Sequence, residues 1–278
     1  MLFQKRTDAR NGIGADLPVL AYPLTGLLDG DRVRLHLDGG KGRVAGWTLQ
    51  KCGNVNITFQ IDLDIGSQLC QTGKFMEDDK IRVAVITGNK EYFYTGGRVN
   101  PHHPGENEKY ANAISRYSAA ADRVTKPMIA AISGDCLKAG MGLIAKCDFA
   151  VAREGVEFGF PEVRMGGVPM MVMAETMGTM PKKRALEAFL SSWNFSAEEA
   201  YRMGLVNRVV TEDKFWDTVD EYVRVFLDTP RELIEMTRKA YYSLEKMENI
   251  QDRRKFAMEM LRTEVLTSMA ETEVQYNI

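Results

Sequence analysis

This chain has few cysteines and few histidines, and neither positive nor negative charge is in large excess. Its 278 residues include four cysteines and three histidines, and 36 basic and 38 acidic side chains give a formal net charge of −2. The cysteines have neither the spacing of a zinc site nor that of a CxxC redox pair, and they are Cys52, Cys70, Cys136 and Cys147. We expect reduced thiols, as in a cytoplasm, and no metal site. The balanced charge argues against nucleic acid or an anionic membrane as a partner, because both need a basic surface.

Long apolar runs and nucleotide-binding motifs are also missing. No segment approaches the roughly 20 apolar residues that span a bilayer. In residues 1–30, Asp8 and Asp16 precede an apolar patch that two prolines interrupt, which makes a poor secretory signal and indicates a cytoplasmic protein. The motifs GxGxxG, GxxxxGK[ST] and GxSxG do not occur, so a dinucleotide site, a phosphate loop and a serine-hydrolase elbow are not indicated.

Strand and helix patterns alternate along the chain. We predict strands at 32–38, 43–49, 81–87, 129–132, 148–152 and 156–160, the first two as a hairpin. We predict helices at 56–74, 107–124, after a capping box at 196–199, and over almost all of the chain from 212 onward. Strands that alternate with helices of ten or more residues indicate an α/β fold.

The most informative segment is KPMIAAISGDCLKAGMGLIAKCDFAV at 126–151. An apolar strand, Ile129–Ile132, ends at Ser133-Gly134, and a turn of small residues around Ala139-Gly140 leads into a short apolar helix. Backbone N–H groups at the start of such a helix stabilise an oxygen that becomes negative during a reaction. The segment therefore predicts where an anion is stabilised before it indicates which reaction takes place.

Residues about 32–265 resemble the crotonase, or enoyl-CoA hydratase/isomerase, superfamily. Four collinear segments carry the resemblance: RVAVITGNKEYFYTGG at 82–97, KPMIAAISGDCLKAGMGLIAKCDFAVA at 126–152, FGFPEVRMGGVP at 158–169 and FSAEEAYRMGLVNRVV at 195–210. The resemblance implies an N-terminal extension at 1–30, a spiral core of repeated ββα units with the active site at 31–205, and a helical C-terminal region at 206–278. That last region would mediate a homotrimer or a dimer of trimers.

The resemblance also implies the chemistry and its residues. Members stabilise a thioester enolate between two backbone amides, which here fall on Gly97 and Ala139. Coenzyme A enters as part of the substrate, and no cofactor is bound permanently. Residues that the resemblance places around the substrate or coenzyme A are Thr95, Gly96, Arg98, Gly140 and Met170. Taken from the residues alone, the glycines could simply permit tight turns.

The acidic positions decide which reaction is expected. Hydratases that the chain resembles use two glutamates, and the first position is Gly142 here. The second is Glu162 in FGFPE, while a third acidic position of some relatives is Met170. One carboxylate is sufficient to move a proton between carbons, whereas adding water usually needs a second group. We therefore predict a double-bond isomerase in which Glu162, its pKa raised by apolar neighbours, is the acid/base.

Other interpretations remain at this stage. Glu162 could be a surface residue at a turn. Arg98 or a loop with His102 and His103 could support carbon–carbon cleavage, decarboxylation or thioester hydrolysis, and that loop could also hold a metal. The missing glutamate is also compatible with a non-catalytic family member, and the thioester could be on a carrier protein. Six methionines are crowded between 165 and 180; we predict that most are core residues, and alternatively that they line an adaptable acyl pocket.

Overall fold

The computed structural model describes residues 34–37, 43–48, 81–88, 90–94 and 104–268. The helix predicted at 56–74 and the residues Thr95, Gly96, Gly97 and Arg98 lie outside these ranges, as do His102 and His103. The predictions made for them therefore stay predictions.

The described strands form two sheets. Their bounds are β1 Arg34–Leu37, β2 Arg43–Thr48, β3 Ile81–Thr87, β4 Tyr92–Tyr94, β5 Met128–Ile132, β6 Asp135–Leu137, β7 Phe149–Arg153, β8 Glu157–Gly159, β9 Phe195–Ser196 and β10 Arg208–Val210. The larger sheet has the order β1-β2-β3-β5-β7-β10 and the smaller has β4-β6-β8-β9. The pair β1–β2 is antiparallel, as the predicted hairpin requires, and the other pairs of the larger sheet are parallel.

Along the chain, most pairs of consecutive strands in the described residues are followed by a helix. Their bounds are α2 Pro104–Ala121, α3 Ala139–Ala145, α4 Met170–Thr176, α5 Lys182–Ser191, α6 Ala197–Arg202, α7 Phe215–Asp228, α8 Arg231–Glu245 and α9 Ile250–Met260. Shorter turns of helix are η2 Val163–Met165, η3 Glu212–Lys214 and the π-helical η4 Leu261–Val265. The chain thus passes from the larger sheet to the smaller and then into a helix in β3–β4–α2, and again in β5–β6–α3. The predicted α/β fold is confirmed.

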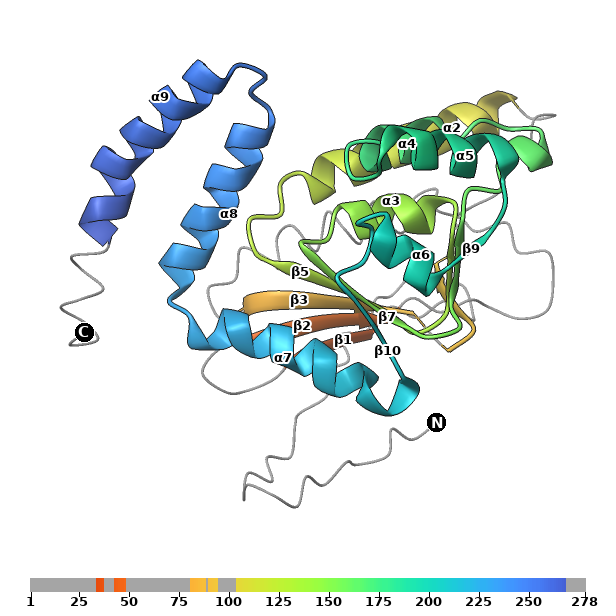
Figure 1. Ribbon diagram of the computed structural model, residues 1–278, viewed down its shortest axis with the longest axis horizontal. Coiled ribbons are helices and arrows are strands. Elements are labelled where there is room, and N and C mark those ends of the chain that lie inside the picture. The colour runs from red at the N-terminus through yellow and green to blue at the C-terminus, as the bar shows by residue number, and fades with distance from the viewer. Residues whose placement is uncertain (1–33, 38–42, 49–80, 89, 95–103, 269–278) are drawn as a thin grey trace.

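The central strands β3, β5 and β7 of the larger sheet are mostly buried on both faces, which explains their continuous apolar sequences. Every residue of β5 is buried, and successive side chains of a strand point to opposite faces. Ala130 and Ile132 belong to a core that includes residues of α3, α5 and α6, whereas Ile129 and Ala131 pack with the apolar side of α7. Figure 1 shows α7 lying along the sheet on the side opposite α3. A parallel sheet covered on both faces is expected to have this composition.

Helix α8 is held against the core by a partly buried carboxylate. Asp148, just before β7, accepts hydrogen bonds from Met128 N at 2.8 Å, Arg238 Nε at 2.8 Å and the Tyr242 hydroxyl at 2.7 Å. The side chains of Arg238 and Asp148 are each only 15% exposed. Arg238 also donates to the Val124 carbonyl and lies over the Tyr242 ring. A partly buried carboxylate satisfied by several donors therefore fixes where α8 leaves the core.

Tyr242→Phe is expected to lower the free energy of unfolding by about 1.5 kcal/mol. A hydrogen bond to a charged group is worth about 1.5–3 kcal/mol, and we expect the lower end because Asp148 keeps its bonds to Arg238 and Met128. Urea unfolding measures the change, provided that the variant and the wild type have the same m-value. Tyr241→Phe is the matched control, since Tyr241 is 62% exposed, and it should change stability by less than about 0.5 kcal/mol. Equal effects of the two variants would contradict the prediction.

Candidate active site

Strand pairing brings the two predicted site segments together. Strands β6 and β8 are parallel, with Leu137 opposite Gly159. The chain therefore leaves the smaller sheet at two adjacent points, once toward Lys138 and α3 and once toward Phe160, Pro161 and Glu162. A hydrogen bond from Lys138 N to the Gly159 carbonyl, 3.1 Å long, joins the two exits. Residues about 20 positions apart in sequence thus share one edge of the fold.

The predicted short apolar helix is α3, and Ala139 is its first residue. Gly140, Met141, Gly142, Leu143 and Ile144 are all buried. The first amides of a helix have no partner within the helix, so the N-terminus of α3 offers N–H groups at the end of β6. The sequence predicted this helix, but it predicted a turn where β6 lies at Asp135–Leu137, so α3 follows β6 and not the strand at 129–132.

Gly140 is required by a close approach between backbones. A Cβ atom at this position would lie 2.2 Å from the Tyr94 carbonyl oxygen and 2.9 Å from Cys136 Sγ. Only glycine therefore lets α3 begin directly against the end of β4. Tyr94 is the residue before Thr95, so the chain enters the segment 95–97 from a point in contact with the start of α3.

Gly142 contributes no carboxylate, and the nearest acid is already paired. A Cβ atom on Gly142 would lie 3.9 Å from Val172 and from Glu175 Cγ. Glu175 forms an ion pair of 2.6 Å with Lys146, at the other end of α3. Burial disfavours the Lys146 ammonium, but hydrogen bonds to Asp122 and Glu175 outweigh it and raise the pKa of Lys146. Glu175 therefore acts as a structural ion-pair partner and does not replace the missing glutamate.

Glu162 is a half-buried acid at the start of η2. Its Oε2 atom is buried and, among the residues that the structure describes, has no hydrogen-bond partner. Desolvation raises the pKa of Glu162, while a backbone hydrogen bond and the charge of Lys138 oppose the shift. The predicted direction of the pKa shift is confirmed. A carboxyl of this kind can take up and release a proton near neutral pH more readily than an exposed glutamate.

The methionine prediction is wrong for most of the cluster. Met180 is buried, but Met165, Met170, Met171 and Met177 are exposed, Met170 by 65%. The reason is that η2 and α4 are short, and in α4 only Thr176 is buried. One side of α4 packs on the core through Val172 and Met173, and the other side stays open. Met170 itself, a predicted substrate contact, begins α4 at this open face.

Other site types find no support among the described residues. No group of three or more His, Cys, Asp or Glu side chains there is placed to hold a metal ion. Cys136 and Cys147 are free thiols, and burial raises the pKa of both. Within the same ranges, no helix has the length and apolar character needed to cross a bilayer.

Comparisons with solved structures agree on the fold. An enoyl-CoA hydratase from Mycobacterium smegmatis superimposes with a TM-score of 0.71 at 23% identity, covering 87% of this chain and 96% of that one. An enoyl-CoA hydratase/isomerase family protein from Silicibacter pomeroyi gives a TM-score of 0.73 at 20% identity, covering 84% and 98%. At these identities the likeness establishes the architecture.

Sequence comparisons extend the agreement to the family. The chain is 37% identical over 149 residues to mevalonyl-coenzyme A hydratase sidH of Aspergillus fumigatus, which covers 50% of this chain and 53% of that protein. It is 28% identical over 177 residues to carnitinyl-CoA dehydratase of Salmonella paratyphi A, covering 62% and 68%. The match thus spans about half the length of the fungal protein. The family profile of enoyl-CoA hydratase/isomerase matches residues 48–274. The chain therefore belongs to the enoyl-CoA hydratase/isomerase family of the crotonase superfamily.

Proposed function

We propose that this protein forms an enolate on an acyl-coenzyme A thioester and moves a proton with Glu162. The amides of Gly97 and Ala139 would bind the thioester oxygen as it becomes negative. The observation that carries the proposal is the buried Glu162 Oε2, which has no hydrogen-bond partner in the described part of the chain, on a segment that leaves the sheet beside the start of α3. No permanently bound cofactor is needed for this chemistry.

Double-bond isomerisation is the reaction that one carboxylate is able to complete. The ionised Glu162 would remove a proton from C2 of a 3-enoyl thioester, and the electron pair would move onto the thioester oxygen as the enolate. Glu162 would then return the proton to C4, so that the double bond lies between C2 and C3. Gly142 and Met170 supply no second acid, and the exposed methionines beside Glu162 would suit an adaptable acyl chain.

Proton exchange tests the enolate step directly. A 3-enoyl-CoA incubated with the protein in deuterated water should gain deuterium at C2 and convert to the 2-enoyl product. NMR and mass spectrometry follow both changes. Binding of the thioester without any exchange would refute the proposal and favour a non-catalytic member of the family.

Hydration of a 2-enoyl thioester is the second candidate. The observation in its favour is that the two curated relatives described above are named as a hydratase and a dehydratase. Formation of a 3-hydroxyacyl thioester from the 2-enoyl substrate would identify this activity, whereas interconversion of enoyl isomers alone would support isomerisation.

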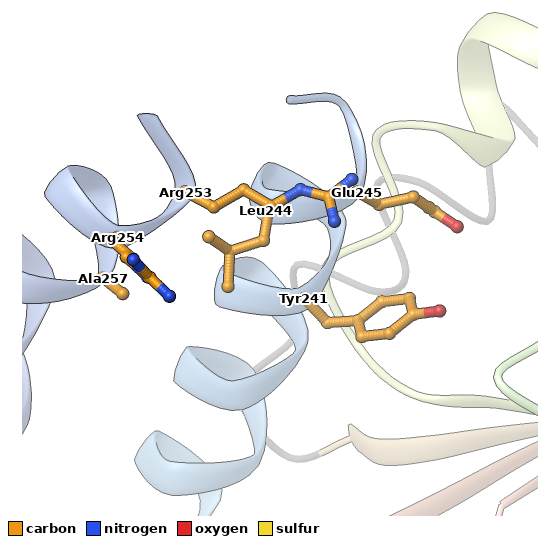
Figure 2. A pocket seen from close by; sticks show the side chains of 6 residues that line it. All are labelled: Tyr241, Leu244, Glu245, Arg253, Arg254 and Ala257. Carbon is orange, nitrogen blue, oxygen red and sulfur yellow. The ribbon is translucent and has the colours of Figure 1, made fainter. Parts of the chain in front are cut away.

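We also propose that the C-terminal helices join copies of this chain. Helices α8 and α9 line a groove of about 490 Å³. Figure 2 shows its lining side chains, which are Tyr241, Leu244, Glu245, Arg253, Arg254 and Ala257. No residue of α8 is buried in the chain. Apolar side chains exposed along this region are Tyr241, Ile250, Met258, Leu261 and Leu266. Large apolar side chains that stay exposed on a pair of helices suit a subunit contact.

Light scattering on the purified protein should therefore give three or six times the mass of one chain. Met258→Asp with Leu261→Asp places two charges on the apolar side of α9 and η4, and the mass should fall toward that of one chain because buried unpaired charges disfavour association. Retained far-UV circular dichroism would show that the variant is folded. A wild-type protein with the mass of a single chain would contradict the assembly.

A further inference from the structure

The end of α5 contacts the chain on both sides of Glu162. Phe160, two residues before Glu162, is fully buried, and its ring packs edge-on against Phe189 of α5 with the ring centroids 4.6 Å apart. Two residues after Glu162, the backbone amide of Arg164 donates a hydrogen bond of 3.3 Å to the Ser192 hydroxyl. The Arg164 guanidinium also donates to the Ser192 carbonyl. The last turn of α5 and the residue that ends it therefore support the segment that carries the acid.

The short loop after Glu162 is closed on itself. The Glu162 carbonyl accepts hydrogen bonds from Met165 N at 3.0 Å and from Gly167 N at 2.8 Å. Gly166 has a φ of 81°, a left-handed conformation that glycine adopts without strain and that turns the chain back. A loop closed by two hydrogen bonds to one carbonyl moves as a unit. A contact that holds Arg164, inside this loop, therefore also holds Glu162.

Ser192 has a backbone conformation that favours glycine. Its φ of 54° and ψ of 27° are left-handed, and the residue that ends a helix in this conformation is usually glycine. Ser192 is only 1% exposed, and its amide donates to the Ala188 carbonyl at 3.2 Å. Glycine would relieve the backbone but would lack the hydroxyl that accepts from Arg164. Strained residues of this kind are concentrated at functional sites, and here the strained residue is the one that bonds to η2.

We propose that Ser192 is a positioning residue that, through its two hydrogen bonds to Arg164, holds the Glu162 carboxyl in place at the substrate. This inference rests on the proposed proton transfer by Glu162 and adds the support on which that transfer depends. Ser192 itself moves no proton. A displacement of about 1 Å at a catalytic site can cost about 10²-fold in rate, so a looser η2 should slow the reaction without a change in the acid itself.

Two substitutions at Ser192 separate positioning from stability. Ser192→Ala and Ser192→Gly both remove the hydroxyl, and each should lower kcat for C2-proton exchange of a 3-enoyl-CoA by about 10-fold while KM changes by less than about threefold. Their stabilities should differ, because glycine adopts a φ of 54° without strain. Ser192→Gly should therefore unfold at a higher temperature than Ser192→Ala. Equal losses of kcat at unequal stability are expected only if the hydroxyl positions the acid.

The pH profile of the same variants gives a second measurement. Desolvation raises the pKa of Glu162, and a looser η2 would admit water to the carboxyl. The midpoint of the rate against pH should therefore move to lower pH in both Ser192 variants. Lys138, the charged side chain that acts on this pKa, is unchanged in them, so the shift would report the hydration of Glu162.

The neighbouring serine provides a matched control. The Ser191 hydroxyl accepts a hydrogen bond of 3.2 Å from Trp193 N, a bond of the same kind that stays within the end of α5. Ser191→Ala should keep kcat within about threefold of wild type and leave the pH midpoint in place. On the other side of the contact, Arg164→Lys should retain more activity than Arg164→Met, because an ammonium is able to donate to the Ser192 carbonyl.

Three results in a protein that exchanges the C2 proton would overturn the inference and leave the enolate proposal intact. The first is a wild-type kcat and pH midpoint in both Ser192 variants. The second is an equal loss in Ser191→Ala. The third is a loss in Ser192→Ala that Ser192→Gly does not share, since activity would then follow stability. A wild-type protein that exchanges no proton at all would refute the enolate proposal, and this inference with it.

Discussion

Glu162→Gln should slow C2-proton exchange and enoyl conversion by about 10²–10⁴-fold, the usual contribution of a positioned acid or base. Glutamine keeps the shape of the side chain but cannot carry a proton. It also fits the local structure, because Oε2 of Glu162 has no hydrogen bond to lose within the described ranges. The effect should appear in kcat more than in KM, since the proton moves only in the transition state. Initial rates by NMR in deuterated water measure it.

The pH dependence of the same reaction gives an independent check. Glu162 must be ionised to remove a proton, and desolvation raises its pKa. The rate should therefore rise with pH through a midpoint above the usual range of a glutamate, and it should fall as pH drops below that midpoint. The charge of Lys138 lowers the same pKa, so Lys138→Met should move the midpoint to higher pH. In Glu162→Gln this rise of the rate with pH should be absent.

A control substitution at a second glutamate distinguishes the catalytic role of Glu162 from a general effect of losing one negative charge. Glu154 is exposed in the turn between β7 and β8, and Glu154→Gln should leave the rate unchanged. A loss of less than about threefold in Glu162→Gln would show that Glu162 is a turn residue without a catalytic role.

Gly140→Ala should both destabilise the protein and reduce its activity strongly. The new methyl group would lie 2.2 Å from the Tyr94 carbonyl oxygen, where ordinary contacts begin at 3.4 Å, so α3 and β4 must separate by about 1 Å. Overpacking of this kind typically costs about 1–3 kcal/mol. A displacement of about 1 Å at a catalytic site can cost about 10²-fold in rate. Urea unfolding and the exchange assay measure the two effects separately.

Gly142→Ala is the control for this prediction. It lies two residues further along the same helix and is buried in the same way, but its nearest neighbours would be 3.9 Å from the methyl group. Alanine also favours a helix over glycine by about 1 kcal/mol. The variant should therefore be at least as stable as wild type. If the two alanine variants behaved alike, the contact between Gly140 and Tyr94 would not be what places α3.

Local patterns predicted most of the elements well. The β1–β2 hairpin, β3 and β5 lie within two residues of their predicted bounds, because apolar periodicity acts over short distances. Helix α2 runs from Pro104 to Ala121, about three residues earlier at each end than predicted, since helix ends depend on caps more than on periodicity. Composition alone failed for the methionines, because a residue type does not reveal whether a neighbouring element covers it.

The sequence by itself determined the α/β class, the acid in FGFPE and the absence of acids at Gly142 and Met170. These depend on residue identity and spacing along the chain. Only the tertiary structure decided that the Lys138 amide donates to the Gly159 carbonyl, that Glu162 Oε2 is buried with no donor among the described residues, and that α7 covers the second face of β3, β5 and β7. Each of these depends on strands that are distant in sequence and pair in a particular register, and the spacing of residues along one chain does not encode that register.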